Sequence, residues 1–354
     1  MQPSGFPVSQ AITLYDVARE AGVSIATVSR VTHNQGGVRP GTRQRVLDVI
    51  EALGYFPDGA AQSMARQRKE VIGLLGMDSR SPETDLEEEG MLFGDMVQRG
   101  VEWALRDSEW SLLISLVHNY DPAGAFRRIQ KIAAKVDGML VIEGTVVANL
   151  LERLAARIPI VLIAGSTDEP HADAFSADNR GGTAALVQHL VSEHGVRRVY
   201  EIAGPPEAPD ARVRHAALHE AVAGYDSVTV TGTFQGWFAA VSGQLAVQEI
   251  LSRPRADRPD AIVCANDQMA LGAIGALEAA GLRVPADIAV VGFDDVYSAA
   301  LLGLTTVRQP MRLMGERACS RLLQRLEDPS LARHAEYLPT RLIVRQSCGC
   351  GSRL

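Results

Sequence analysis

Residues 14–31, LYDVAREAGVSIATVSRV, decide the fold of the N-terminal part of the chain. Apolar residues recur at helical spacing before Gly22 and again after it, which predicts two short helices joined by a tight turn. Thr13 and Ser24 precede these helices, and both residue types are favoured as N-caps. Two helices that meet at a glycine-containing turn of this length are a helix-turn-helix candidate. Because plain three-helix bundles contain similar helix pairs, the spacing alone leaves both interpretations open.

The second helix of a helix-turn-helix unit lies in the major groove of DNA, with its N-terminal residues at the base edges. Here the helical spacing turns Val28 and Val31 inward and leaves an outer face free. Arg30 on that face is suited to a bidentate bond with guanine, and Ile25 and Ala26 are suited to thymine methyl groups. Nearby hydroxyl and arginine side chains are expected to bind phosphate oxygens. The predicted DNA-binding residues are Ser24, Ile25, Ala26, Thr27, Ser29, Arg30, Arg39 and Thr42.

Charge is unevenly distributed along the chain. The whole chain carries −7 at pH 7, whereas residues 1–69 carry +3 and residues 70–354 carry −10. A basic N-terminal part on an acidic body indicates that only the N-terminal part approaches a polyanion. Within that part we expect a loop over residues 33–41 and a third helix over residues 42–53. The small residues of 59–66 predict a weak helix that orders only against a partner.

From residue 71 onward, short apolar runs alternate with helical segments. This alternation predicts an α/β fold, with parallel sheets that carry helices on both faces. The remaining length of about 280 residues is long for one sheet, so we expect two similar lobes. Ligands of such folds bind at the carboxyl ends of the strands, in the cleft between the lobes. The predicted strands are residues 71–75, 112–117, 138–142, 160–164, 199–203, 261–265 and 289–293.

Polar residues follow three of these strands, where a ligand is expected. They are Asn266 with Asp267, Asp294 with Asp295, and Asp210 with Arg214. An arginine opposite a carboxylate suits the adjacent hydroxyls of a sugar ring. Other interpretations are open: Asp267 and Asp295 are expected to cap the helices that follow them, and Trp237 or Phe238 is either a core residue or part of the rim of the site.

The chain resembles the LacI/GalR (lactose/galactose-repressor) family of bacterial transcription regulators. The resemblance covers about residues 12–345, and its motifs occur in the family's order. Besides the N-terminal helix pair, the matching segments are residues 55–57 (YFP), Ala61-Gln62, 265–272 (ANDQMALG), 291–295 (VGFDD), 305–310 (TTVRQP) and 342–345 (LIVR).

The resemblance implies a homodimer on double-stranded DNA with a palindromic operator. Each helix-turn-helix head binds one half-site, and two hinge helices enter the minor groove, where an apolar wedge parts a base step. Ala61 and Met64 are the expected minor-groove residues of the hinge, although the family usually has leucine at the wedge position. The effector-contacting positions implied by the family are Asp210, Arg214, Phe238, Asn266, Asp294 and Gln309.

These features predict a repressor of sugar-uptake or sugar-catabolism genes that a sugar inducer releases from its operator. A nucleobase corepressor or a protein corepressor is the alternative. We expect a helix-turn-helix domain over residues 10–57 and a hinge helix over 58–67. A two-lobed effector and dimerisation domain, similar to the type I periplasmic binding proteins, is expected over 70–346, followed by a flexible tail over 347–354.

Other functional classes find little support in the sequence. The chain lacks a Walker loop, a G-x-S-x-G elbow and an H-E-x-x-H helix, so we expect neither an enzyme nor a cofactor. No signal peptide or membrane span is visible, which favours a cytoplasmic, nucleoid-associated protein over an exported solute receptor. The pair Cys348-Gly-Cys350 does not have the spacing of a CxxC zinc site and is expected to be two reduced thiols on a frayed tail; a redox or metal role is the alternative.

Overall fold

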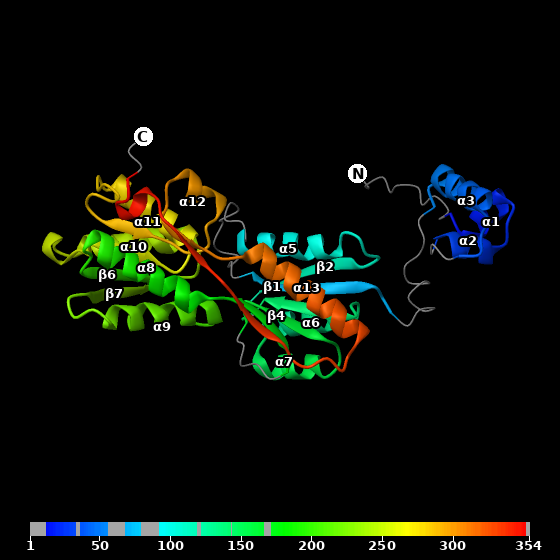
Figure 1. The fold of residues 1–354 in the computed structure, drawn as a ribbon, viewed down its shortest axis with the longest axis horizontal. Coiled ribbons are helices and arrows are strands. Elements are labelled where there is room, and N and C mark those ends of the chain that lie inside the picture. The colour runs from blue at the N-terminus through cyan, green and yellow to red at the C-terminus, as the bar shows by residue number, and fades with distance from the viewer. Residues whose placement is uncertain are drawn as a thin grey trace, which may run out of the picture. The chain divides into compact units, whose positions relative to one another are not determined.

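The computed structural model describes residues 12–32, 36–55, 68–78, 92–118, 122–142, 144–165 and 171–351. The chain divides into two compact units, Met1–Lys69 and Glu70–Leu354, whose helices and strands are drawn in Figure 1. The predicted hinge over 58–67, with Ala61 and Met64, lies outside the described residues, so its role stays a prediction. None of the helices in the described ranges is long and apolar enough to cross a membrane.

The described part of the first unit is a bundle of three helices. Their bounds are α1 Leu14–Ala21, α2 Ile25–Thr32 and α3 Pro40–Leu53. Helix α3 begins two residues earlier than predicted, because the first turn of a helix accepts a proline, whose missing N–H is not needed there. The bundle buries Val17, Val28 and Val46 completely.

Caps fix both ends of α1 and the start of α2. Thr13 and Asp16 form a capping box at the start of α1, as the sequence indicates for Thr13. Gly22 ends α1 with a φ of 61°, a left-handed conformation that favours glycine. At the start of α2, the Ser24 hydroxyl accepts a hydrogen bond from the Thr27 backbone N–H over 3.2 Å. The predicted helix-turn-helix geometry is therefore present.

The first lobe of the second unit is built on a six-stranded parallel sheet with the order β11-β5-β4-β3-β1-β2. Its strands are β1 Val71–Asp78, β2 Ser111–His118, β3 Gly138–Ile142, β4 Ile160–Ile163, β5 Asp173–Ala177 and β11 Ala335–Leu338. Helices α5 (Leu92–Leu105) and α13 (Met311–Glu327) pack on one face of the sheet. Helices α6 (Pro122–Ala133) and α7 (Ala148–Ala155) cover the other face.

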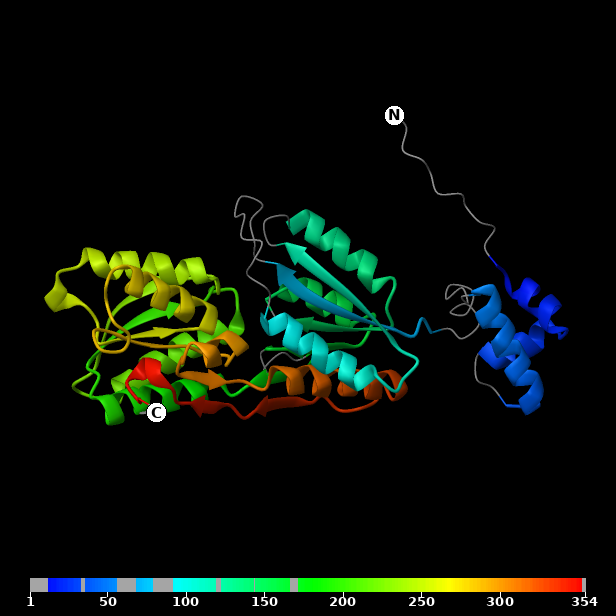
Figure 2. The same cartoon turned by 90° about the horizontal axis from the view of Figure 1, so that it is seen from above.

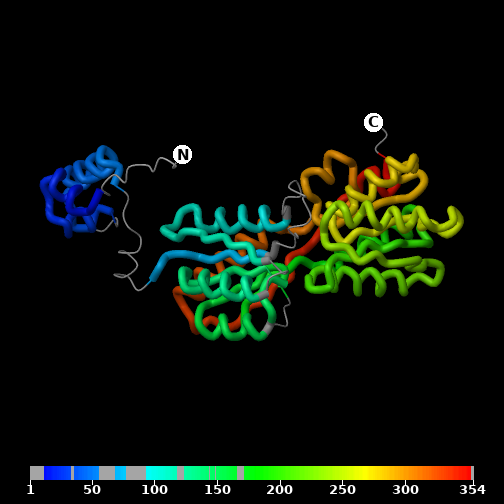
Figure 3. The backbone as a smooth tube through the Cα atoms, turned by 180° about the vertical axis from the view of Figure 1, so that it is seen from behind, coloured from blue at the N-terminus to red at the C-terminus, as the bar shows by residue number. Residues whose placement is uncertain are grey.

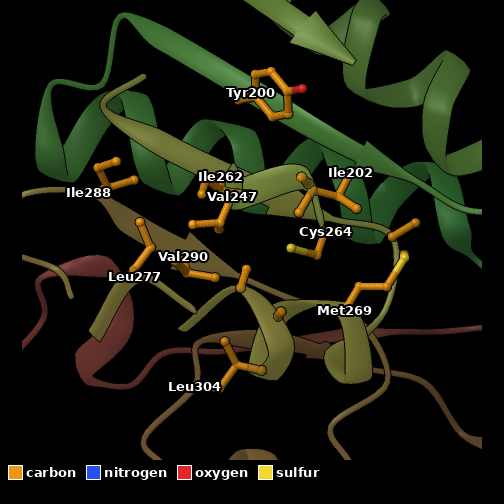
Figure 4. Packing of buried hydrophobic residues seen from close by; sticks show 14 of the residues in the cluster. Tyr200, Ile202, Val247, Ile262, Cys264, Met269, Leu277, Ile288, Val290 and Leu304 are labelled. Carbon is orange, nitrogen blue, oxygen red and sulfur yellow. The ribbon is translucent and has the colours of Figure 1, made fainter. Parts of the chain in front are cut away.

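The second lobe contains a four-stranded parallel sheet with the order β7-β6-β8-β9. Its strands are β6 Arg198–Ala203, β7 Thr229–Gln235, β8 Ala261–Cys264 and β9 Ala289–Val291. Helices α8 (Asn179–His194) and α9 (Pro209–Ala223) contribute to the apolar cluster on one face. Helices α10 (Ala240–Ser252) and α11 (Asp267–Ala279) contribute to the cluster on the other, where Figure 4 shows Ile202, Ile262 and Val290 packed together.

The chain passes between the two lobes three times, as the tube in Figure 3 and the view in Figure 2 allow the reader to follow. The first passage leads from β5 into α8, and the second from β10 (Thr306–Arg308) into α13. The third leads from β11 into β12 (Arg341–Ile343), which pairs antiparallel with β10. Because each passage lies at the end of a strand, the lobes are joined at the edge where parallel sheets bind ligands.

All seven predicted strands are present, with ends that differ by up to three residues. The sequence did not predict β5, β7, β10, β11 or β12. Strand β7 has the sequence TVTGTFQ and is only partly buried, so it lacks a continuous apolar run. Strands β10 and β12 are only three residues long, which is too short for a periodic pattern to appear.

The prediction of a frayed tail from residue 347 is wrong for the residues that the structure describes. Ser347 and Cys348 are 4% and 2% exposed, and both lie in a short 3-10 helix, η2 (Gln346–Cys348). The Ser347 hydroxyl donates to the Val290 carbonyl over 2.5 Å and accepts from the Thr305 N–H over 2.8 Å. The segment is therefore a packed part of the second lobe.

A buried carboxylate fastens α13 to the first sheet. Asp173 on β5 is fully buried and accepts hydrogen bonds from Arg321 Nε over 2.7 Å, Arg325 Nε over 2.6 Å and the His334 backbone N–H over 2.6 Å. Burial alone raises the pKa of Asp173, but the bonds from Arg325, His334 and Arg321 outweigh it, so the pKa lies below its ordinary value. Two arginines held by one acid form a strong connection between helix and strand.

Replacing Asp173 by alanine is expected to destabilise the fold by about 3–5 kcal/mol, because two guanidinium groups lose their buried partner. Urea unfolding at pH 7 measures this loss. As the matched control, Glu220→Ala removes an exposed ion pair with Arg180 and is expected to cost less than about 1 kcal/mol. Because the folded pKa is lowered, the contribution of Asp173 is fully present above the ordinary pKa of 3.8 and is lost as the pH falls through the folded value. Equal losses for the two variants would contradict this assignment.

Candidate DNA-binding head and effector site

Helix α2 presents one buried and one exposed face. Val28 and Val31 are 0% and 4% exposed, whereas Ile25 is 39% exposed and Ala26 and Arg30 are also exposed. Among the described residues, no side chain bonds the Arg30 guanidinium. An exposed arginine on a short helix after a tight turn is free to bond a base edge.

The other predicted DNA-binding residues lie in or just before α2 and at the start of α3. Ser24 is exposed, and its hydroxyl lies 2.9 Å from that of Thr27, so both belong to the cap of α2. Ser29 is half-buried, as is Thr42 in the first turn of α3. Arg39 is the exposed N-cap residue of α3 and makes no side-chain cap bond. Hydroxyls and an arginine at two helix starts fit phosphate contacts.

The predicted effector residues gather at the carboxyl ends of the strands of the second lobe. Asn266 follows β8, Asp294 follows β9, and Gln309 follows β10 directly. Asp210 and Arg214 lie one turn apart on α9, which follows β6 through a short loop. Arg214, Asn266, Asp294 and Gln309 are each less than 10% exposed. Residues from widely separated parts of the chain thus form one buried polar group, which we name the Arg214 cluster.

The Arg214 guanidinium is held firmly by structural partners. Its Nε donates to Asn179 Oδ1 over 2.8 Å, and its Nη1 donates to the Ala265 carbonyl over 2.6 Å. The guanidinium also lies over the Phe293 ring, 3.9 Å from the ring centre. Asp210 and Asp294 are farther away, at 3.5 and 3.7 Å, which exceeds the length of a good hydrogen bond. Guanidinium N–H groups on this side therefore remain available to a ligand oxygen.

Sequence reasoning missed Asn179. Its Nδ2 donates to Asp210 Oδ1 over 2.7 Å, while its Oδ1 accepts from Arg214, so it aligns both residues. Asn179 begins α8 directly after β5. The strand DAFSA has no continuous apolar run, and without it the position of Asn179 at a strand end is invisible in the sequence.

The Arg214 cluster contains acceptor oxygens that no short hydrogen bond satisfies in the described part of the chain. Burial raises the pKa of Asp210 and raises that of Asp294 to about 6, and the Arg214 charge opposes both shifts. Gln309 Nε2 donates to Asp294 over 2.6 Å. The Gln309 Oε1 atom is buried and has no partner in the described part of the chain. Two carboxylates that share one guanidinium, beside an unpaired amide oxygen, favour a ligand rich in hydroxyl or N–H donors.

Two predicted helix caps are wrong. Asn266, not Asp267, caps α11, because its side chain accepts from the Met269 N–H over 3.0 Å. Asp267 is fully buried, and its carboxylate accepts bonds from Thr306 Oγ1 and the Val296 N–H. Asp295 does not cap a helix either: it bonds Arg308 and Arg345, each over 2.6 Å. Both acids hold together the segments next to the cluster.

Asn266 and Phe238 are connected with each other at the ends of β8 and β7. Asn266 Nδ2 donates to the Phe238 carbonyl over 3.0 Å, so the amide is already engaged. Phe238 is half-buried, with a φ of 65°, and its ring covers Gly204, where a Cβ atom would lie 2.5 Å from the ring. The neighbouring Trp237 is 37% exposed. Phe238 thus packs on the loop before α9, and Trp237 is the more accessible aromatic side chain.

The chain is similar to known bacterial regulators over nearly all of its length. One family model, bacterial regulatory proteins of the lacI family, matches residues 13–58, and another, a periplasmic binding protein-like domain, matches residues 187–348. HTH-type transcriptional repressor PurR of Aliivibrio fischeri is 30% identical over 95% of this chain and 98% of its own length. Catabolite control protein A of Priestia megaterium is 29% identical over 95% and 99%.

Solved structures show the same similarity in three dimensions. The lac repressor dimer bound to operator and the anti-inducer ONPF has a TM-score of 0.80 and 29% identity, over 96% of this chain and 99% of that one. A complex of the transcriptional regulator CelR with cellobiose has a TM-score of 0.67 and 30% identity, over 95% and 99%.

Proposed function

The chain belongs to the LacI family of bacterial regulatory proteins, and we propose that this DNA-binding transcriptional repressor is released from a palindromic operator by a sugar. Relatives of the chain include transcriptional repressors, and the proposal assigns no enzymatic activity to it. On this proposal the protein acts as a homodimer on cytoplasmic DNA and controls genes for the uptake or breakdown of the sugar. The Arg214 cluster is the effector site.

The unsatisfied acceptor oxygens of the Arg214 cluster carry the proposal for the ligand. A sugar offers hydroxyl donors to Asp210, Asp294 and the unpaired Gln309 Oε1, while its oxygens accept from Arg214. Trp237 at the end of β7 is suited to cover the apolar face of a sugar ring. The similarity to a regulator solved with cellobiose supports the same class of ligand.

The position of the Arg214 cluster suits a ligand that changes the arrangement of the two lobes. Asn179 stands at the first passage between the lobes and Gln309 at the second. A ligand that bonds the cluster therefore acts on two of the three connections, and its binding energy favours one arrangement of the lobes. Such a change alters the spacing of the two heads in a dimer and so the affinity for the operator. Coupling of this kind typically amounts to about 1–3 kcal/mol.

A nucleobase corepressor is the second candidate. The ring N–H groups of a base are also donors to Asp210 and Asp294, and a base would stack on Trp237. The two candidates predict opposite effects, since an inducer weakens operator binding and a corepressor strengthens it. A protein corepressor is the third candidate, and it leaves the Arg214 cluster without a small ligand.

Thermal melting of the full-length protein against mono- and disaccharides, with nucleobases included, tests the proposal. A ligand present at about 100 times its dissociation constant stabilises the fold by about 2.7 kcal/mol, so one sugar is expected to raise the melting temperature clearly. A rise with a purine or pyrimidine base alone would replace the sugar by a corepressor. If no compound of the panel raised the melting temperature, both small-molecule proposals would be contradicted.

A further inference from the structure

Four side chains with metal-binding atoms meet at the C-terminal end of α8. They are His189 and His194 of α8 and the two C-terminal cysteines, Cys348 and Cys350. All four ligand atoms lie within 4.8 Å of one another. The two His Nε2 atoms are 3.3 Å apart, and Cys348 Sγ lies 3.4 Å from that of His189. Cys350 Sγ lies 3.6 Å from His189 Nε2 and 3.3 Å from His194 Nε2.

These four separations match four of the six edges of a tetrahedral zinc site. Zinc binds imidazole nitrogen at about 2.0–2.1 Å and thiolate sulfur at about 2.3 Å. With tetrahedral angles, two nitrogen ligands are then about 3.4 Å apart, and a nitrogen and a sulfur ligand about 3.6 Å apart. Each of the four separations among His189, His194, Cys348 and Cys350, which we name the quartet, lies within about 0.3 Å of these values.

The local backbone explains why the four residues converge. The two histidines are five positions apart at the C-terminal end of α8, whose last residue is His194 and whose C-cap is Gly195. The 3-10 helix η2 ends at Cys348, and the next residue, Gly349, has a φ of 109°. This left-handed residue reverses the chain so that the two thiols turn toward the same point. A Cβ atom at Gly349 would lie 3.0 Å from the His194 ring, so glycine also lets the chain approach the histidine closely.

We propose that His189, His194, Cys348 and Cys350 form a structural Zn²⁺ site. Two thiolates balance the charge of the metal, so a neutral site fits this partly buried position. The Thr305 hydroxyl lies 3.1 Å from Cys348 Sγ, at the distance of a supporting hydrogen bond to a ligand sulfur.

Hydrogen bonding without a metal is a weaker explanation of the quartet. Thiol and imidazole protons can be shared only pairwise, whereas one metal ion gives all four ligand atoms a common partner. A different group, Glu201 with His215 and His219, has an ordinary explanation. Glu201 bonds both histidines, at 2.9 and 3.2 Å, and the histidines are exposed. This second group serves as the internal control.

The proposed zinc connects the C-terminal segment to the helix that orders the Arg214 cluster. Asn179, which holds Arg214, is the first residue of α8, and His194 is the last. At the other end, Ser347 of η2 bonds Val290 of β9 and Thr305, the residue before β10. We therefore expect zinc removal to lower the melting temperature of the second lobe without removing the residues that bind DNA or effector.

Metal analysis of the full-length protein, purified without a histidine tag, tests this site. We expect about one zinc per chain, and an intense visible spectrum of tetrahedral thiolate-bound Co²⁺ after exchange for cobalt. Cys350→Ser and His194→Ala should lose the zinc and the cobalt spectrum. Cys319→Ala and the double variant His215→Ala/His219→Ala leave the quartet intact and should keep both. Chelation of the unchanged protein should lower its melting temperature, and added zinc should restore it.

Three results would overturn the proposal. The first is reduced protein that takes up no zinc from a zinc-containing buffer. The second is zinc content that survives in Cys350→Ser or disappears in the His215/His219 control. The third is a Cys348–Cys350 disulfide, seen as a mass lower by two hydrogens, in protein that binds no zinc after reduction. None of these results depends on the identity of the effector, so a failure of the zinc proposal would leave the proposed function untouched.

Discussion

Replacing Arg214 by lysine is expected to abolish the sugar-induced rise in melting temperature while operator binding in the absence of sugar stays close to that of the unchanged protein. Lysine keeps a positive charge between Asp210 and Asp294, so the buried carboxylates remain compensated. Lysine lacks the planar guanidinium, whose N–H groups donate to Asn179 and the Ala265 carbonyl and, on our proposal, to a ligand oxygen at the same time. Alanine is a poorer test, because two uncompensated carboxylates cost about 3–5 kcal/mol in folding.

Arg253→Lys is the matched control for this experiment. Arg253 also lies in the second lobe and stacks on the aromatic ring of Tyr200, but it pairs with Glu249, away from the Arg214 cluster. Both lysine variants should fold, and only Arg214→Lys should lose the ligand response in the melting experiment. A normal response in Arg214→Lys, or an equal loss in both variants, would remove Arg214 from the effector site.

Replacing Arg30 by alanine is expected to weaken binding to the preferred operator by about 1–3 kcal/mol and to remove the preference for guanine at one position of each half-site. Arg30 is exposed on α2 and lacks a side-chain partner in the described residues, so its loss should not disturb the bundle. Competition binding with operators that carry each of the four bases at that position measures the effect.

Arg19→Ala separates base recognition from loss of charge. Arg19 is exposed on α1 and bonds Asp16 over 2.7 Å, so the control removes one positive charge from the same head. A phosphate contact lowers the affinity for all sequences alike and reduces its salt dependence. If Arg30→Ala behaved in that uniform way, and kept its preference among the four bases, the base-reading role would be wrong.

Periodicity predicted the parts of the fold in which one face of an element is buried. The spacing around Gly22 predicted the helix-turn-helix unit, because α2 turns Val28 and Val31 into a small core. Continuous apolar runs predicted the central strands of both sheets, since parallel strands are buried on both faces. Strand β5 was not predicted, because it begins with the charged residue Asp173. The sequence does not show that this acid is buried and paired with two arginines.

The candidate site could be predicted only in part. Asp294 follows a recognisable strand, and the resemblance to the family supplied Gln309; the structure brings both together with Arg214. Asn179 was missed because it depends on β5. The meeting of the four proposed zinc ligands was not predicted, because the two histidines and the two cysteines lie about 155 residues apart in the chain. The Cys-Gly-Cys spacing also matches no familiar zinc motif. Only the packing of η2 against α8 reveals it.

The affinity of the full-length protein for its own operator, with and without the sugar that melting identifies, tests the central claim most directly. The operator is first selected from random DNA, and binding is then followed by fluorescence anisotropy at fixed salt. We predict a palindromic consensus and a loss of affinity of about 5- to 150-fold when the sugar is present, which corresponds to about 1–3 kcal/mol of coupling. A selected pool without a consensus, or an affinity that a bound sugar leaves unchanged, would contradict the account of a sugar-released repressor.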